Sequence, residues 1–272
     1  MVRYTVMAWS FLFVNQLTRD HIEFLREKVF RVDDLWPQYR LLLSDLSLLS
    51  SQTSSSSSVV SIERTLLYGG YSLVGPLFRH ASFVSIDCSP PSADDRGSYN
   101  RIALDDPRFI PCPTSRRSSV YDTGLPDGSA DLVLVPNLVH HIKDQSRLFS
   151  ELARIVCTGG RVYLFEALVR EIHQAPDDFL RYTPYGLESA LNSAGLFLDS
   201  PCRTEGGPFQ VISYCWTQAL QYLPDSIRQE YSEWFFHKHY PDLMSLDRKY
   251  TVNLCKQFSQ FPMSFSLTAT KP

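Results

Sequence analysis

The chain has 272 residues, of which 44% are hydrophobic and 20% are charged, a balance typical of a globular protein with a sizeable core. The formal net charge of −3 argues against a nucleic-acid-binding protein, which needs a basic surface. This length suits one large α/β domain, with or without appended helices.

The six cysteines stand alone in the sequence. None forms a C-x-x-C pair, and no cluster of histidines completes a zinc pattern. Isolated cysteines on apolar segments are typical of buried thiols in a reducing compartment. We therefore expect a cytoplasmic protein without disulfides and without a metal site. The cysteines are Cys88, Cys112, Cys157, Cys202, Cys215 and Cys255.

Residues 1–50 are predicted to form a helical cap. Arg3 and the apolar run after it resemble a signal peptide, but no small-x-small cleavage site follows. The run is too short to span a bilayer, and "TRDHIEFLREKVF" continues it as an amphipathic helix. A second helix is expected after Pro37, through "QYRLLLSDLSLLS". A packed N-terminal helix is the favoured interpretation, and a signal anchor is the second.

The serine-rich residues 51–58 are predicted to be a linker or surface loop before a domain at 59–272. Two short β runs follow, "TLLYGG" at 65–70 and "SFVSID" at 82–87. Between them, "LVGPLFRH" reads as a short helix or turn. This order predicts two parallel strands joined by a right-handed crossover.

The next segments continue the alternation of strands and helices. Residues 89–124 are rich in Pro, Ser, Asp and Arg and contain one short predicted strand, "RFIPC". The predicted order is then the buried strand "ADLVLV", the helix "KDQSRLFSELARIVC", the strand "RVYLFEALV", the helix "YTPYGLESALNSAG", the strand "LFLDSPC" and the final strand "FPMSFSLTAT". The pattern predicts a doubly wound, mostly parallel α/β sheet.

A helical insert at about 204–256 interrupts this order before the last strand. It is unusually aromatic, and its aromatic residues include Tyr214, Trp216, Tyr222, Tyr231, Trp234, Phe235, Phe236 and Tyr240. One interpretation is an additional helical layer that covers hydrophobic surface. The other is a substrate lid or the interface of a homo-oligomer, and the two are compatible.

Ligands of open α/β sheets bind beyond the carboxyl ends of the strands. A phosphate-binding P-loop is excluded, because Pro76-Leu77 follows Gly75 where Lys and Ser or Thr are needed. The turn also lacks G-x-G-x-x-G, which disfavours NAD and FAD. Asp87 ends the second predicted strand, about 20 residues after the glycines, where a carboxylate can accept both ribose hydroxyls.

Three stretches, "TLLYGGYS", "FVSIDCSP" and "LPDGSADLVLVPNLVHHIKDQSRLFSELARIVCTGGRVYLFEA", resemble the class I S-adenosylmethionine-dependent methyltransferases. The likeness is to the methyltransferase type 11 group, which modifies small molecules and glycans, and "DDFLRYTPYGLESALNSAGL" extends it. It covers roughly residues 60–200 and the final strand. It implies a Rossmann-like fold, S-adenosylmethionine as cofactor, and methyl transfer to a small-molecule or sugar-like acceptor.

The resemblance also assigns residues to the cofactor. Asp87 corresponds to the acid that binds the ribose, and Cys88 to the residue beside the adenine. The implied cofactor-binding set is Gly69, Gly70, Tyr71, Asp87, Cys88, Asp122, Pro136 and Asn137. Two positions depart from the family: Leu67 stands where a carboxylate is usual, and Tyr71 where glycine is usual. Each departure is expected to weaken binding of the methionine end by about 1 kcal/mol or more.

His140 and His141, at the mouth of the fourth predicted strand, are the candidate general bases, with His141 favoured. They read equally well as packed helix-entry residues. Glu166 is expected to face the same crevice, and Arg181 and Tyr182 are candidates for acceptor binding. Three hypotheses follow: an active methyltransferase, an inactive methyltransferase-like binding or scaffold subunit, and altered chemistry on the same fold. The aromatic insert favours an acceptor with apolar or aromatic surface.

Overall fold

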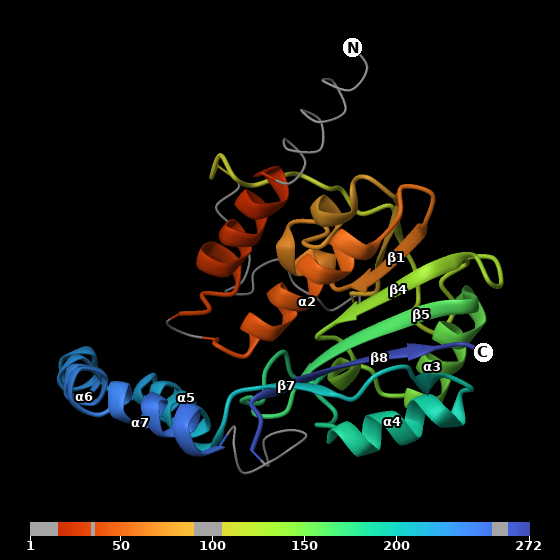
Figure 1. Ribbon diagram of the computed structural model, residues 1–272. Coiled ribbons are helices and arrows are strands. Elements are labelled where there is room, and N and C mark those ends of the chain that lie inside the picture. Colours follow the sequence, from red (N-terminus) through yellow and green to blue (C-terminus); the bar gives the residue numbers. More distant parts are fainter. Residues whose placement is uncertain (1–15, 34–35, 90–104, 252–260) are drawn as a thin grey trace, which may run out of the picture.

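A computed structural model describes residues 16–33, 36–89, 105–251 and 261–272. Within these ranges the chain forms one eight-stranded sheet in the order β3-β2-β1-β4-β5-β8-β6, with β7 also paired to β8 (Figure 1). Strands β1 to β5 are parallel, whereas β8 runs antiparallel to its neighbours. The strands are β1 Ser58–Glu63, β2 Ser82–Asp87, β3 Arg116–Arg117, β4 Ala130–Pro136, β5 Val156–Ala167, β6 Phe197–Leu198, β7 Arg203–Glu205 and β8 Ser264–Thr270.

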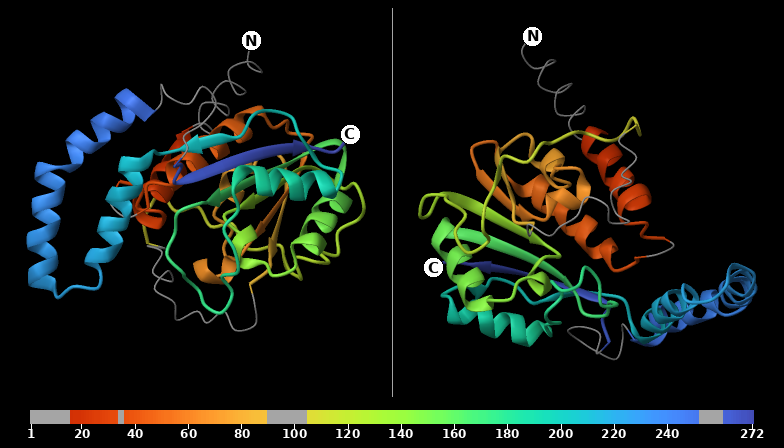
Figure 2. Two further views of the ribbon diagram at one scale, coloured as in Figure 1. Left: turned by 90° about the horizontal axis from the view of Figure 1, so that it is seen from below. Right: turned by 180° about the vertical axis from the view of Figure 1, so that it is seen from behind.

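Helices cover both faces of this sheet (Figures 1 and 2). The α-helices are α2 Tyr39–Gln52, α3 Gln145–Ile155, α4 Pro184–Ser193, α5 Pro208–Leu220, α6 Asp225–Lys238 and α7 Tyr240–Leu246. The shorter helices are η1 Leu25–Val29, η2 Thr65–Tyr68, η3 Gly75–Phe78, η4 Val139–His141 and η5 Asp247–Thr251. The predicted doubly wound, mostly parallel architecture is confirmed.

Each face of the sheet has its own hydrophobic core. On one face, η1 and α2 bury Leu25, Leu42 and Leu46 against strand residues such as Phe165. On the other, α3 and α4 bury their apolar faces against the same sheet. Capping fixes where these two helices start: the Asp144 side chain accepts from Arg147 N, and the Thr183 side chain from Gly186 N.

Asp45 joins α2 to the sheet through buried polar contacts. Its Oδ2 accepts hydrogen bonds from Tyr163 Oη at 3.0 Å and Ser266 Oγ at 2.6 Å, and Oδ1 pairs with Arg203. The helix continues to Gln52 and β1 begins at Ser58. The serine-rich segment is therefore a short loop, and the N-terminal helices share a core with the sheet.

The first strand is not the predicted run at 65–70 but Ser58–Glu63. Val59, Val60 and Ile62 fill the core positions of this strand, and the serines around them hid the pattern. Residues 65–68 instead form η2, and positive φ angles of 64° and 82° at Gly69 and Gly70 end it. "RFIPC" is not a strand either; β3 is the pair Arg116–Arg117.

The insert between β7 and β8 extends away from the sheet (Figures 1 and 2). Its helices α5, α6 and α7 pack mainly on one another, with Trp216 stacked on Phe235 at 5.3 Å and near Trp234 at 5.6 Å. The insert covers apolar surface mainly within itself, and α5 also joins the segment after β5, where Tyr214 contacts Glu171. The insert also presents aromatic surface to solvent, since Tyr222 is 87% exposed. None of the described helices combines the length and hydropathy needed to cross a membrane.

Candidate active site

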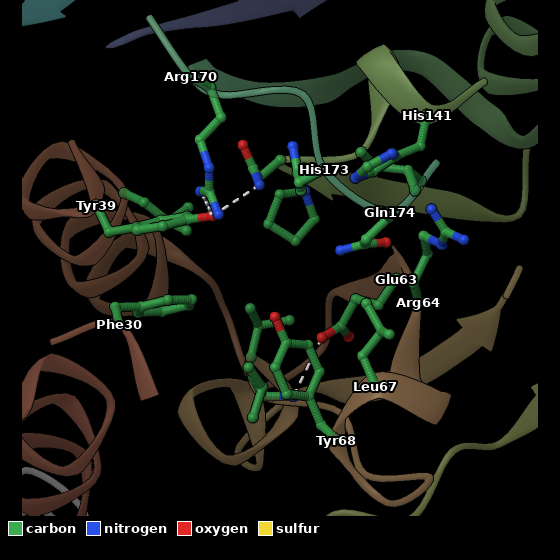
Figure 3. Close-up of a pocket in the computed structure, with 16 residues that line it drawn as sticks. Phe30, Tyr39, Glu63, Arg64, Leu67, Tyr68, His141, Arg170, His173 and Gln174 are labelled. Carbon is green, nitrogen blue, oxygen red and sulfur yellow. Dashed lines mark hydrogen bonds between the residues drawn. The ribbon is translucent and has the colours of Figure 1, made fainter. Parts of the chain in front are cut away.

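Two cavities adjoin at the carboxyl ends of the parallel strands. The first, here called the Glu63 cavity, has about 620 Å³ of empty space and is lined by Phe30, Tyr39, Leu42, Glu63, Arg64, Leu67, Tyr68, Leu73, Val74, Pro136, Asn137, Leu138, His141, Arg170, His173 and Gln174 (Figure 3). The second, the Cys88 cavity, has about 1400 Å³ and opens widely to solvent. Arg64 and His141 line both cavities and form their common wall.

The acid at the end of β1 is Glu63, which is 5% exposed. Its Oε1 accepts from Ser72 Oγ at 2.5 Å, and Oε2 accepts from Leu73 N at 3.1 Å. Burial raises its pKa. The expectation that Leu67 marks a lost carboxylate is therefore wrong. Because β1 lies earlier in the sequence than predicted, the strand-end acid lies four residues before Leu67, and both side chains line the Glu63 cavity.

Tyr71 does not occupy the ligand space, contrary to the concern raised by its position. Its ring contacts Phe109 edge to face at 5.5 Å, and its backbone pairs with Pro113. It is not among the described non-glycine residues with positive φ, because Gly69 and Gly70 take that conformation. These two glycines shape the turn after η2, and neither they nor Tyr71 line the two cavities.

Arg64 follows Glu63 and is an under-satisfied buried cation. Its side chain is 7% exposed, and Nη2 lies 3.7 Å from Asp177 Oδ2. The Nε and Nη1 atoms are buried without a hydrogen-bond partner among the described residues. Burial lowers its pKa. A buried guanidinium with unused donors at the wall of two cavities is suited to an anionic group of a ligand.

Asp87 ends β2 and is 3% exposed. Its Oδ1 accepts from Thr65 N at 2.9 Å, Ser89 N at 3.1 Å and Ser89 Oγ at 2.6 Å. Its Oδ2 lies 3.8 Å from Arg117 Nε. The neighbouring Cys88 lines the second cavity, and burial raises its thiol pKa to about 12, so the thiol stays protonated.

The remaining predicted cofactor residues divide between the cavity and the surface. Pro136 and Asn137, at the end of β4, line the Glu63 cavity. Asn137 has a φ of 56° and donates from Nδ2 to Tyr39 Oη at 2.8 Å, while its Oδ1 is buried without a described partner. Asp122 is exposed, lines neither cavity, and accepts from Gly124 N at 3.2 Å.

His140 and His141 lie on η4, directly after β4. His140 Nδ1 is 2.6 Å from Glu166 Oε2, and Glu166 Oε1 accepts from Val139 N at 2.7 Å. His141 Nδ1 is 2.5 Å from Asp177 O. Burial lowers the pKa of His140 to about 3 and of His141 to about 2. A general base works best with a pKa near the operating pH, so these two histidines are poor candidates for the predicted base role.

Sequence reasoning missed His173, which lies in the segment after β5. Its Nε2 lies 3.4 Å from His140 Nε2, so three histidines meet although no histidine cluster was expected. It also missed Arg170, which donates from Nη1 to Tyr39 Oη at 2.9 Å. The polar stretch "REIHQAPDD" directly after a buried strand was the available signal. Arg181, by contrast, pairs with Asp178.

Tyr182 also has a structural role. Its ring packs against the core between the sheet and the helices α3 and α4, where it meets Phe149 at 6.5 Å. Glu166 lies at the end of β5 as expected, but it is 3% exposed and lines neither cavity. Burial raises its pKa, while the backbone N–H groups of η4 oppose that rise. Glu166 thus supports η4 and does not contact a ligand directly.

Comparison with known proteins agrees with this architecture. Residues 69–164 match the sequence family described as "Methyltransferase domain". A SAM-dependent methyltransferase from Archaeoglobus fulgidus has a TM-score of 0.50 and 14% identity, covering 92% of this chain and 99% of that chain. A chain of the Haloferax volcanii complex that contains the Trm112 methyltransferase activator has a TM-score of 0.50 and 15% identity, covering 96% and 97%.

Residues 69–164 are thus similar in sequence to a methyltransferase domain, and the chain shares its fold with the Archaeoglobus fulgidus enzyme. This match agrees with the methyltransferase resemblance of the sequence, and the solved structures support the predicted fold. A weaker likeness is to phosphoethanolamine N-methyltransferase 2 of Haemonchus contortus, solved with S-adenosyl-L-methionine, at 14% identity and a TM-score of 0.46, covering 84% of this chain and 52% of that chain. No protein of curated function matches the sequence.

Proposed function

We propose that this methyltransferase moves the methyl group of S-adenosylmethionine to a small-molecule acceptor bound in the Glu63 cavity. The observation that carries the proposal is the shared wall of the two cavities, formed by Arg64 and His141. The adenosine would lie in the Cys88 cavity, and the methionine end would reach past this wall toward Glu63. A ligand of that length crosses the carboxyl ends of β2, β1 and β4, where open α/β sheets bind their ligands.

Two side chains supply the polar contacts that this pose needs. Asp87 lines neither cavity itself, but it directly precedes Cys88 and Ser89, which line the Cys88 cavity. Its Oδ1 already accepts three internal hydrogen bonds, so Oδ2 would be the atom for the ribose hydroxyls. The unpartnered Nε and Nη1 donors of Arg64 suit the carboxylate of the methionine end. Both interactions are charge-assisted, which makes each worth about 1.5–3 kcal/mol.

The Glu63 cavity favours an acceptor with an apolar or aromatic body. Phe30, Tyr39 and Tyr68 contribute aromatic surface, and Leu42 and Val74 add aliphatic surface. Methyl transfer from a sulfonium is an in-line displacement that disperses positive charge, so the protein contributes mainly by positioning the two reactants. A sugar-like acceptor would stack on the same rings.

Calorimetric titration with S-adenosylmethionine and S-adenosylhomocysteine tests the cofactor assignment. We expect binding to the wild type and an affinity at least tenfold weaker for Asp87→Asn, which keeps the side-chain shape. Asp242→Ala, an exposed position in α7, is the matched control and should bind like the wild type. No binding at millimolar ligand would refute the proposal, and an unchanged affinity in Asp87→Asn would refute the ribose contact.

A specific observation favours the alternative of a binding or scaffold subunit without catalysis. The Arg64 side chain stands between the two cavities and partly blocks the path of a ligand that spans both. In addition, Asp87 Oδ1 accepts hydrogen bonds from Thr65 and Ser89, so this oxygen is not available to a ligand. Formation of S-adenosylhomocysteine from S-adenosylmethionine with pooled small-molecule acceptors separates the two functions. Binding without any turnover across phenol, amine, carboxylate and sugar acceptors would support the alternative.

We also propose that the insert mediates self-association. Its helices extend from the sheet and expose Tyr222, Tyr231 and Trp234 at 87%, 45% and 44%. Light scattering of the full chain measures this directly, with Trp234→Glu as the disrupting variant. A monomer at all concentrations would refute the proposal.

A further inference from the structure

Three histidines from two segments meet beside the Glu63 cavity. His140 and His141 come from η4, and His173 from the segment after β5. Their ring centroids lie 3.9, 4.8 and 5.2 Å apart. One ligand nitrogen of each ring lies within 4.8 Å of those of the other two. Figure 3 shows His141 and His173 on the same side of this cavity.

The partners of the three Nδ1 atoms fix the ring tautomers. His141 Nδ1 faces the carbonyl oxygen of Asp177 at 2.5 Å, and His173 Nδ1 faces that of Glu171 at 3.1 Å. His140 Nδ1 faces the Glu166 carboxylate at 2.6 Å. A backbone carbonyl oxygen only accepts, so Nδ1 of His141 and of His173 carries the hydrogen and their Nε2 atoms keep a lone pair. Burial raises the pKa of Glu166 to about 8, and its ionised form, which a bound cation favours, gives His140 the same tautomer.

Two of the Nε2 atoms lie close together. His140 Nε2 and His173 Nε2 are 3.4 Å apart, and with both rings in the Nδ1–H tautomer these two acceptors repel unless a cation lies between them. Zinc–nitrogen bonds of about 2.0–2.1 Å at a tetrahedral angle place two ligand nitrogens about 3.3–3.4 Å apart. The observed separation equals this spacing. Imidazole nitrogen is also a ligand type that Zn²⁺ prefers.

Outer contacts of the rings follow the pattern of metal-bound histidines. Such histidines donate their other ring N–H to a carboxylate or a backbone carbonyl, which fixes the tautomer and orients the ring. All three Nδ1 contacts are of this kind. Glu166 is itself held by the backbone N–H of Val139 at 2.7 Å. The supporting shell is complete before any ion binds.

The charges around the cluster permit a cation. Three arginines lie on the segments that carry the histidines or share the cavity wall, and each faces a carboxylate. The pairs are Arg64–Asp177, Arg170–Glu171 and Arg181–Asp178. Glu166 is a fourth acidic group, bonded to His140, and burial raises its pKa to about 8. Each of the three arginines is thus offset by a carboxylate, so a divalent ion does not meet uncompensated positive charge.

We propose that His140, His141 and His173 bind one Zn²⁺ through their Nε2 atoms. Three protein ligands leave one tetrahedral position for water or a ligand atom, as in catalytic zinc sites. Because His141 and His173 line the Glu63 cavity, a molecule in that cavity lies next to the ion. This last consequence rests on the proposed function, because it makes the methyl acceptor the group that meets the metal.

Metal binding by the full chain tests the proposal without cofactor or acceptor. After removal of bound metal, competition with a chromophoric chelator should give one Zn²⁺ per chain. His173→Ala should weaken the affinity at least 100-fold, and Glu166→Gln about 10–100-fold. His237→Ala, an exposed histidine of α6, is the matched control and should bind as the wild type does.

Two further measurements protect this test from a folding artefact. Far-UV circular dichroism and thermal melts should show that His173→Ala stays folded, and Co²⁺ should give the visible bands of a four-coordinate site. Absence of stoichiometric binding by the wild type, or equal affinity of wild type and His173→Ala, overturns the proposal. Either failure leaves the cofactor titration unaffected, so the two proposals fail separately.

Discussion

Replacement of Arg64 by Met should make the protein more stable while weakening its binding of S-adenosylmethionine. The Arg64 side chain is 7% exposed, and its Nε and Nη1 donors have no hydrogen-bond partner among the described residues. Each unpartnered buried donor costs about 1–3 kcal/mol. Met keeps the length and the apolar contacts of the side chain but removes both donors and the buried charge.

One favourable interaction is lost in the exchange. Nη2 of Arg64 lies 3.7 Å from Asp177 Oδ2, whose side chain is 27% exposed and can be hydrated instead. Such a pair contributes about 0.5–1 kcal/mol. The net expectation for Arg64→Met is a gain of about 1–3 kcal/mol in the free energy of unfolding. At roughly 2–4 °C per kcal/mol for a chain of this size, the melting temperature should rise by several degrees.

Binding should change in the opposite direction. If the two Arg64 donors bind the methionine carboxylate, their loss costs about 1.5–3 kcal/mol, or roughly 10–100-fold in affinity. Calorimetry measures both quantities, with Arg79→Met, an exposed position, as the control. The prediction fails if Arg64→Met is less stable than the wild type and binds the cofactor with unchanged affinity. That result would mean that Arg64 serves only as a structural ion-pair partner of Asp177.

Two other substitutions test the polar contacts that hold the fold. Asp45→Ala should lower the free energy of unfolding by about 2–4 kcal/mol in chemical denaturation, because it leaves the buried hydroxyls of Tyr163 and Ser266 unpaired; a loss below 1 kcal/mol would contradict this. Burial acts to raise the pKa of Glu151, but hydrogen bonds from Arg154 and Thr123 outweigh it and bring the pKa to about 2. The stabilisation from its charge is therefore complete above the ordinary carboxyl pKa of about 4.3 and is lost as the pH falls toward 2. Glu151→Gln should be less stable than the wild type by about 2 kcal/mol at pH 7, and the gap should close in melts near pH 2; a constant gap would refute the assignment.

Individual strands and helices were predictable where the local hydrophobic pattern matches the burial of the residues. The apolar run at 130–135 became β4, and the capping residues before α3 and α4 marked where those helices begin. The pattern failed at β1, because Ser58 and Ser61 interrupt its apolar residues and extend a serine-rich stretch. The strand is fixed by its parallel pairing with β2 and β4, which a local pattern does not contain.

The site was predictable only where a strand end marks it. Asp87 was predicted as a site residue because an acid ends an apolar run. Glu63 and Arg64 were missed because β1 lies earlier in the sequence than predicted. His173 lies in a loop without periodicity, 33 residues from His140. Their contact depends on the tertiary fold, so the local sequence does not reveal it. Asp122 was expected at the cofactor but is exposed, because the carbonyl oxygens of Thr123 and Gly124 accept from Arg116 and hold the turn at the surface.

The polar groups near the Glu63 cavity also bear on the acceptor. Arg64 lines it with unused donors, and Arg170 lines it beside the aromatic ring of Tyr39. Each guanidinium faces a carboxylate, Asp177 for Arg64 and Glu171 for Arg170, so these groups offer hydrogen-bond donors without a net positive charge. An acceptor with an apolar body and a neutral or anionic polar end fits both the rings and the guanidinium groups.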